Sequence, residues 1–270
     1  MYEEPYRWVE AVGNRRQYLD EQLKQGSPVV GLAYDQGVLL LTVSKGTAKL
    51  YEIYDRLALG GMGHPADLEK LRFNLLEMAH VEGFNRSPSD VTGGRMVKYG
   101  IAPVIKQAFE EVFKAPYIVK ILLAELGPKT GSHSFLTINY DGTFEEGTHY
   151  AVLAGTQAVE QAMATYLREQ GPAAPFLEQA VATALRAWAL GDRLQRKAME
   201  DVSEGERTDA EKRDKTDDTS LYSHVRETVA EKTIECAVLD RNQPGPSKYR
   251  TVMPDELGRL LPKDVTASLS

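Results

Sequence analysis

The residue types that usually carry chemistry are few in this chain and form no catalytic pattern. The single cysteine, Cys236, excludes both a thiolate cluster for zinc and an internal disulfide. The five histidines form no HxxxH or HExxH pair, and no serine lies in a nucleophile-elbow motif. The run Gly60–Gly63 lacks the spacing of either phosphate-binding glycine loop. The residues therefore indicate no metal site and no cofactor, and they favour an interaction subunit over an enzyme.

The composition is typical of a soluble protein with one large domain or two small ones. The chain has 270 residues and a formal net charge of −7, which argues against a general nucleic-acid binder. No apolar run approaches the length of a membrane span, and the acidic N-terminus lacks a signal-peptide pattern. We therefore expect no nucleic-acid partner, no membrane and a cytoplasmic location. Cys236 lies in the apolar run 234–239 and is expected to be a buried core residue.

The chain opens with a helical segment that precedes the first strand. Residues 6–25 have helical spacing, and an apolar stripe can form from Trp8, Val12, Tyr18, Leu19 and Leu23. A helix placed before the core must find its own surface to pack on. Its aromatic residues favour a contact with another subunit, and the alternative is docking on its own domain.

Strand and turn signals dominate the stretch Gly26–Gly63, around which the rest of the chain is organised. Residues 28–33 and 38–43 are short apolar runs, and Tyr34–Gly37 between them predicts a tight β-hairpin. A second hairpin is predicted from Lys49 to Leu59, with Gly60–Gly63 closing it. Because the runs are apolar on both faces, protein should cover both sides of the sheet.

Helices and further strands follow this stretch. Helices are predicted at 65–82, with Gly83 as the C-cap, at 92–113, where Pro103 imposes a kink or a later start, and at 155–169 and 175–190. Strands are predicted at 118–126, 135–139 and 150–153. This order predicts an α+β fold in which two helices cover each face of a stack of sheets.

An acidic segment without apolar periodicity covers residues 200–219. We interpret it as a mobile insert, and a solvated surface loop is favoured over a binding site for a basic partner. Beyond it we predict a helical piece at 225–231, a strand at 232–239 and a short helix at 254–261.

Several segments, taken in order, carry a resemblance. The first are GSPVVGL at 26–32, GVLL at 37–40 and KLYEIYDR at 49–56. Others are RSPSDVT at 86–92, YIVKILLAE at 117–125, TINYDG at 137–142 and IECAVLDRNQP at 234–244. Together they resemble the proteasome subunit family, most closely the α-type subunits of bacterial 20S proteasomes.

The resemblance implies a fold and a division of the chain. The fold is the four-layer αββα sandwich of the Ntn-hydrolases, preceded by the N-terminal helix of α-type subunits. Residues 1–25 would be a pore and gate segment with a ring-contact helix. Residues 26–262 would be the proteasome-fold domain, with the acidic insert at about 200–219, and residues 263–270 a C-terminal tail.

The resemblance also implies which kind of subunit this is. In the family, proteolytic β subunits use an N-terminal threonine, whose hydroxyl is the nucleophile and whose α-amine is the base, tuned by an Asp and a Lys. The matching positions here are Ser27, Val43 and Lys49. Ser27 lies behind a helix and has an amide nitrogen, and Val43 cannot replace a carboxylate, so a non-catalytic α subunit is implied. The alternatives are a self-compartmentalising peptidase that uses Ser27 after removal of the first 26 residues, and a stand-alone scaffold.

Partners are implied as well. Seven copies would form an outer ring that templates and contacts the β subunits, restricts entry to unfolded proteins and docks a hexameric ATPase through its C-terminal tails. Lys49 matches the family's lysine that binds the carboxylate of such a tail, and Gly26 would let the penultimate residue pack closely. The gate would be formed by Met1, Tyr2, Glu3, Glu4 and Pro5. The Tyr-Asp-Arg gate motif of archaeal and eukaryotic members is absent from this N-terminus.

Overall fold

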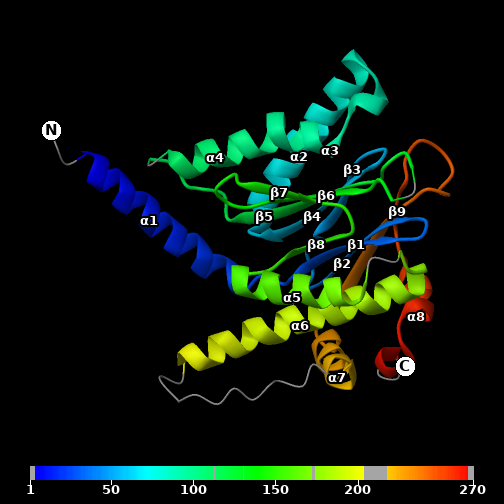
Figure 1. Cartoon of the computed structure of the whole chain (residues 1–270). Coiled ribbons are helices and arrows are strands. Elements are labelled where there is room, and N and C mark those ends of the chain that lie inside the picture. The colour runs from blue at the N-terminus through cyan, green and yellow to red at the C-terminus, as the bar shows by residue number, and fades with distance from the viewer. Residues whose placement is uncertain (1–3, 112, 130, 172–173, 204–217, 267–270) are drawn as a thin grey trace.

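Two antiparallel five-stranded sheets are stacked on each other in the middle of the molecule (Figure 1). This computed structural model describes residues 4–111, 113–129, 131–171, 174–203 and 218–266. Sheet A has the strand order β10-β9-β2-β1-β8, with bounds Tyr249–Thr251, Thr233–Asp240, Gly37–Ser44, Val29–Tyr34 and Tyr150–Leu153. Sheet B has the order β3-β4-β5-β6-β7, with bounds Leu50–Tyr54, Leu57–Gly63, Val119–Glu125, Ser134–Ile138 and Phe144–Gly147.

The first hairpin forms because its residues can be buried on both faces. Every residue of β2 is buried, and its antiparallel register with β1 places Val29 opposite Thr42. The sheets approach closely at Gly31, because a Cβ there would lie 2.9 Å from the Phe135 ring of β6. The hairpin predicted around Tyr34–Gly37 is therefore confirmed, and it turns through two residues between β1 and β2.

Helices cover both outer faces of the sheets, as Figure 1 shows. Over sheet B lie α2 (Pro65–Asn85), α3 (Gly93–Arg95), the π-helical turn η2 (Met96–Ile101) and α4 (Ala102–Glu110). Over sheet A lie α5 (Gln157–Glu169) and α6 (Leu177–Ser203). One apolar core fills each of the three interfaces between these four layers. The predicted α+β sandwich with a helical layer on each face is confirmed.

Helix α2 begins where Pro65 predicts, and the Nδ1 atom of the N-cap His64 accepts a hydrogen bond from the Ala66 N–H at 3.3 Å. It continues to Asn85, so the prediction that Gly83 is the C-cap is wrong. A Cβ on Gly83 would come within 2.2 Å of the Tyr54 hydroxyl oxygen. Glycine at this position leaves room for the Tyr54 side chain of β3 and does not end the helix. A 3₁₀ turn, η1 (Pro88–Asp90), follows.

The glycine run Gly60–Gly63 forms the second half of strand β4 and does not close a hairpin. The turn lies earlier, between β3 and β4, at residues 55–56. A Cβ on Gly60 would lie 2.8 Å from Val29 in the other sheet, and one on Gly61 would lie 2.3 Å from Leu68 of α2. The predicted turn at Gly60–Gly63 is therefore wrong, because these glycines let strand β4 pack closely against sheet A on one side and helix α2 on the other.

Several elements in the second half of the chain differ from the sequence-based expectation. Helix α6 is 27 residues long and runs well past the predicted end near residue 190, and α7 (Asp218–Val229) begins before residue 225. The ends of the predicted acidic insert are thus helical, and residues 204–217 lie outside the described residues. Strands β7 and β10, and the short helix α9 (Lys263–Thr266) within the predicted tail, were not expected. Helix α8 (Pro254–Leu260) agrees with the prediction.

Cys236 of β9 is buried, as expected from its apolar run. Burial raises the pKa of its thiol, so the neutral form dominates at physiological pH. Among the helices that the structure describes, none is both long and apolar enough to cross a lipid bilayer.

Helix α1 (Glu4–Leu23) projects away from the sandwich and is held by its C-terminal half (Figure 1). Leu19 and Leu23 are fully buried between the sheets, but Trp8 is 48% exposed and Tyr18 is 50% exposed. The predicted apolar stripe is present, since helical spacing puts Trp8 on the same face as Val12, Leu19 and Leu23, and the last three pack against the core. Trp8 is exposed because it lies on the projecting half of the helix, and Tyr18 lies off the stripe. The Arg15 guanidinium donates hydrogen bonds to four carbonyl oxygens at 2.6–3.1 Å. Two belong to the last turn of α4, Ala108 and Phe109, and two to the segment that follows it, Glu111 and Lys114.

Replacing Arg15 by alanine is expected to loosen α1 without unfolding the sandwich. The carbonyls at the end of α4 would lose a cationic donor, which lowers the free energy of local opening by about 1–3 kcal/mol. Hydrogen exchange of the α1 amides measures this opening. Arg16→Ala is the matched control, because Arg16 is half exposed and makes an ion pair with Asp141 that contributes about 0.2–1 kcal/mol. Equal effects of the two substitutions would contradict the role of Arg15.

Candidate functional site

The residue that matches the family's nucleophile is buried, and its hydroxyl is held by hydrogen bonds. Ser27 lies just before β1 and is 8% exposed. Its hydroxyl donates a hydrogen bond to the Val43 carbonyl oxygen at 2.5 Å and accepts one from the Trp188 indole Nε1–H at 3.1 Å. Neither partner is a base, and the nitrogen of Ser27 is a peptide amide. The hydroxyl is thus used for structure and is not activated for attack.

The position that matches the family's aspartate belongs to the apolar core. Val43 is fully buried in the cluster between sheet A and helices α5 and α6, which also contains Leu41 and Trp188. A carboxylate here would be surrounded by apolar side chains and costly to ionise. The geometry therefore lacks the acidic group that tunes a threonine-type active site, as the sequence comparison of these positions implied.

Two side chains of α6 that sequence reasoning missed hold the segment Gly26–Ser27 in place. Besides Trp188, the buried Gln195 donates from Nε2 to the Gly26 carbonyl oxygen at 2.8 Å, and its Oε1 accepts the Gly155 N–H at 2.5 Å. The only sign of this role in the sequence is a glutamine in the apolar helix. It does not reveal the partners, because Gly26 and Gly155 are distant in the sequence.

Gly26 packs closely against other residues of the chain. A Cβ on Gly26 would lie 2.6 Å from the Met62 Cγ atom of β4. This contact explains the glycine without a ligand, so the role of Gly26 in close packing of an ATPase tail stays a prediction.

Replacing Ser27 by alanine is expected to lower stability but not activity. The Trp188 N–H would lose its buried acceptor, which costs about 1–3 kcal/mol in the free energy of unfolding. Chemical denaturation of the variant measures this loss, and peptide hydrolysis by the assembled complex should equal that of the wild type. Loss of hydrolysis by a fully assembled Ser27→Ala complex would identify Ser27 as a nucleophile and contradict this account.

Lys49 lies at the end of the loop that joins β2 to β3, next to a carboxylate. Its backbone N–H donates to Glu235 Oε2 at 2.8 Å, and Glu235 Oε1 accepts a hydrogen bond from the Ser44 hydroxyl. Partial burial lowers the pKa of the Lys49 ammonium, the charge of Glu235 opposes this shift, and the charge of Lys232 adds to it. The site thus combines a partly exposed lysine with a fixed acidic neighbour.

Most of the predicted gate residues are not among those that the structure describes. Met1, Tyr2 and Glu3 are outside the described residues, and α1 begins at Glu4 and includes Pro5. The structure brings Gly26, Ser27 and Val43 together, whereas Lys49 belongs to a separate cluster with Ser44 and Glu235.

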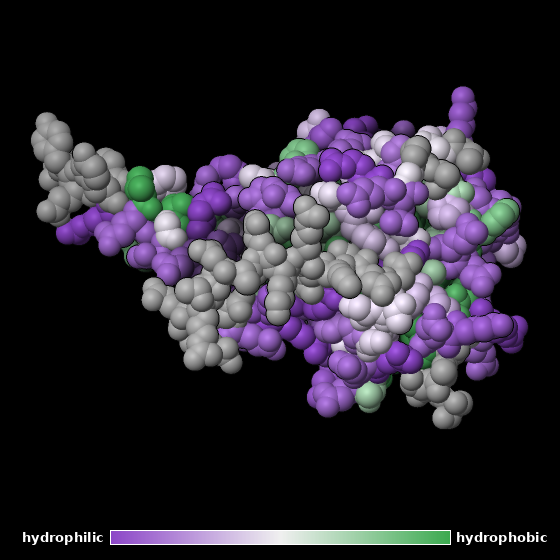
Figure 2. Space-filling model, turned by 60° about the horizontal axis from the view of Figure 1, so that its bottom comes forward, coloured by the Kyte–Doolittle hydropathy of each residue, from purple (hydrophilic) through white to green (hydrophobic). Residues whose placement is uncertain are grey.

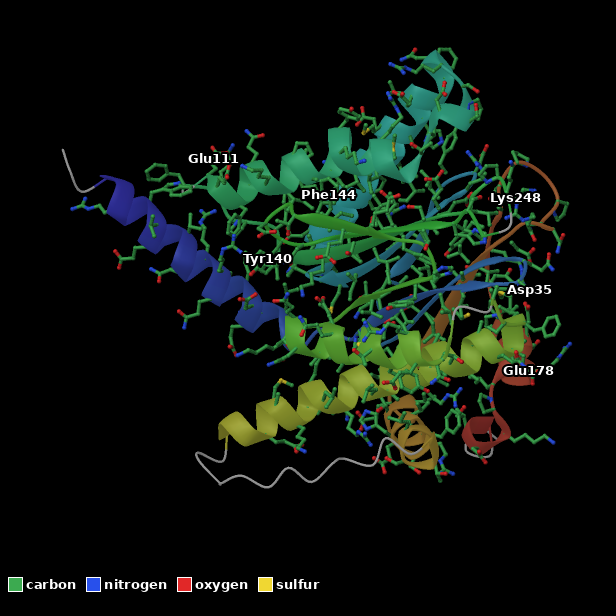
Figure 3. All side chains as sticks on the ribbon, in the orientation of Figure 1. Asp35, Glu111, Tyr140, Phe144, Glu178 and Lys248 are labelled. Carbon is green, nitrogen blue, oxygen red and sulfur yellow. The ribbon has the colours of Figure 1, made fainter. Side chains whose placement is uncertain are left out.

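A groove of about 1140 Å³ opens between α1, the β6–β7 region and α5. In Figure 3, Tyr140 lies between α1 and the sheets, and its hydroxyl donates to Asp20 Oδ1 at 2.7 Å. Lys120 lies in the groove wall, where its Nζ donates to the Ala154 carbonyl oxygen and to Glu160 Oε1, both at 2.9 Å. Because this lysine is held in a buried ion pair, it is not available as a free amine base.

Comparison with known proteins agrees with this picture. The family model described as "Proteasome subunit" matches residues 23–199. "Proteasome subunit alpha 1" of Rhodococcus erythropolis is 29% identical over 94% of this chain and 87% of its own length. "Proteasome subunit alpha" of Nocardioides sp. is 26% identical over 92% of this chain and 84% of its own length.

A third relative has a slightly higher identity over a shorter span. "Proteasome subunit alpha" of Thermomonospora curvata is 30% identical over 69% of this chain and 81% of its own length. The fold, the unactivated Ser27 and these matches lead to one conclusion. The chain belongs to the proteasome subunit family, and the bacterial relatives that it resembles are α subunits.

Proposed function

We propose that this chain is the non-catalytic α subunit of a bacterial 20S proteasome in the cytoplasm, with proteolysis carried out by separate β subunits. The observation that carries the proposal is the engaged hydroxyl of Ser27, which is bonded to the Val43 carbonyl oxygen and the Trp188 indole. The α-subunit names of the relatives support it further. A peptidase that uses Ser27 after removal of 26 residues is not favoured, because that cleavage would remove α1, whose Leu19 and Leu23 belong to the core.

Assembly into a larger particle is supported by apolar side chains that the chain itself leaves uncovered. On α1, Trp8 and Val9 are exposed on the projecting part of the helix, and Figure 2 shows apolar residues there. On α2, Phe73 is 59% exposed and Phe84 is 91% exposed. Exposed aromatic residues of this kind are enriched in protein interfaces. We infer that α1 contributes to a seven-membered ring and to contacts with β subunits.

The ring would control entry and recruit an ATPase. We propose that residues 1–5 restrict the pore to unfolded chains and that Lys49 receives the C-terminal carboxylate of a hexameric ATPase. The partly exposed ammonium of Lys49 supports this role, since a compact cation suits a terminal carboxylate.

Native mass spectrometry tests the proposed assembly. The full-length chain is measured alone and after co-expression with the β chain of the same genome. A ring of seven chains, and a larger particle that contains both chains and hydrolyses peptides, are the expected results. A chain that binds no β subunit would point instead to a stand-alone scaffold and would contradict the proposal.

A further inference from the structure

The ammonium of Lys49 has room for an external partner. Its side chain is partly exposed, and in the described ranges its Nζ makes no hydrogen bond and no ion pair. A lysine ammonium has three donors, and leaving them unused in a partly desolvated position costs free energy. A bound anion would recover that cost.

The neighbouring carboxylate does not fill this role, because its two oxygens point elsewhere. Glu235 Oε2 accepts the backbone N–H of Lys49, and Oε1 accepts the Ser44 hydroxyl. Ser44 is the last residue of β2, and Lys49 directly precedes β3. Glu235 therefore ties the two ends of the β2–β3 loop together and fixes the backbone from which the Lys49 side chain extends.

A second cation lies beside Lys49. The β2–β9 register places Ser44 opposite Thr233, so Lys232 directly precedes the residue that faces the end of β2. Its charge acts on that of Lys49, and within the described part of the chain its Nζ has no hydrogen bond either. The charge of Lys232 also lowers the pKa of Asp192, but that carboxylate is already bonded to His224 and Arg196. The ammonium groups of Lys49 and Lys232 are therefore both left to attract an external anion.

We propose that Lys49 and Lys232 together form the binding site for a terminal carboxylate, and that Glu235 is the residue that positions Lys49 in it. The proposal rests on the proposed docking function of Lys49 and names the second cation and the support of that same site. Glu235 has two opposed effects. Its hydrogen bonds order the loop, and its negative charge weakens the attraction for an incoming carboxylate.

Substitutions of Glu235 separate these two effects. Glu235→Gln keeps both hydrogen bonds, because the amide oxygen can accept from Lys49 and the amide nitrogen can donate to Ser44. It removes the charge and should tighten carboxylate binding by about two- to fivefold. Glu235→Ala removes the hydrogen bonds as well, and the loosened loop should weaken binding about threefold. A residue that only stabilises the fold would not give opposite signs.

The experiment uses the assembled particle of α and β chains with dimethylated lysines, which keep their charge. The probe is acetyl-Gly-Ser-Gly-Ser-Tyr-Ala, compared as the free acid and as its C-terminal amide, and ¹³C NMR follows the lysine methyl signals. The free acid should shift the signals of Lys49 and Lys232, and the amide should not. Lys232→Ala should weaken binding about two- to fivefold. Lys45→Ala, in the exposed part of the same loop, is the matched control and should change nothing.

Each failure has a distinct reading. If the acid binds through Lys49 but Lys232→Ala binds as tightly as the wild type, or if both Glu235 variants change affinity in the same direction, the further inference is overturned and docking at Lys49 stands. If the acid and the amide bind alike, docking of a terminal carboxylate is overturned as well. Should Glu235→Ala fail to assemble, Glu235→Gln and Lys232→Ala still decide the question.

Discussion

Replacing Lys49 by alanine is expected to reduce ATPase-driven protein degradation at least about tenfold while the particle still hydrolyses small peptides. The substitution removes the cation proposed to bind the tail carboxylate, and a charge-assisted contact of this kind contributes about 1.5–3 kcal/mol. Peptide hydrolysis should persist, because the proposed active sites lie in other subunits. The measurement is degradation of an unfolded protein by the reconstituted particle with its ATPase, alongside hydrolysis of a fluorogenic peptide.

Lys45→Ala is the control, since Lys45 is exposed in the same β2–β3 loop, whereas the hydrogen bonds of Glu235 to this loop come from Ser44 and Lys49. If the Lys49→Ala particle degraded protein as fast as the wild type with the ATPase, the proposed docking role of Lys49 would be contradicted. A loss of peptide hydrolysis together with degradation would instead indicate a defect of assembly.

Replacing Trp188 by alanine is expected to have the largest effect on stability. Trp188 is fully buried among the largest side chains of the core between sheet A and α6, and its Nε1–H is bonded to Ser27. The cavity and the lost contacts should cost about 3–5 kcal/mol in the free energy of unfolding. Chemical denaturation of the isolated chain, compared at one protein concentration, measures the loss.

Trp8→Ala is the matched control for Trp188, because Trp8 is 48% exposed and should change the stability of the chain by less than about 0.5 kcal/mol. Trp188→Phe keeps most of the apolar volume and removes the indole N–H. Its free energy of unfolding should fall between those of the Trp188→Ala and Trp8→Ala variants. A Trp188→Ala chain as stable as the wild type would contradict the packing described for α6 on sheet A.

The elements that sequence reasoning predicted well are those whose own residues determine them. The hairpin of β1 and β2 follows from two apolar runs and a short polar turn, and α2 starts at Pro65 because proline fits the first turn of a helix. These signals are local, so the structure could confirm them with small shifts in the ends of the elements.

The elements that were missed or misplaced depend on contacts between distant segments. Gly60 and Gly83 look like turn and cap residues in the sequence, but each lies where a side chain of another element packs close to its backbone. The short strands β7 and β10 carry few apolar residues and exist because they pair with β6 and β9. Local patterns do not contain this information.

The candidate site shows the same division. Ser27, Val43 and Lys49 could be singled out from the sequence because a resemblance aligned them with positions of known use. Their partners could not be, since Trp188 is 161 residues from Ser27 and Glu235 is 186 residues from Lys49. What the hydroxyl of Ser27 does is decided by these tertiary contacts.

The most direct test of the central claim is peptide hydrolysis by a complex in which only the β nucleophile has been removed. This chain, with Ser27 intact, is assembled with β subunits whose N-terminal threonine is replaced by alanine. If the chain is a non-catalytic α subunit, the assembled particle should have no peptidase activity, and wild-type β subunits should restore it. Hydrolysis by the threonine-free particle, lost again on Ser27→Ala substitution, would contradict the account and make this chain a peptidase.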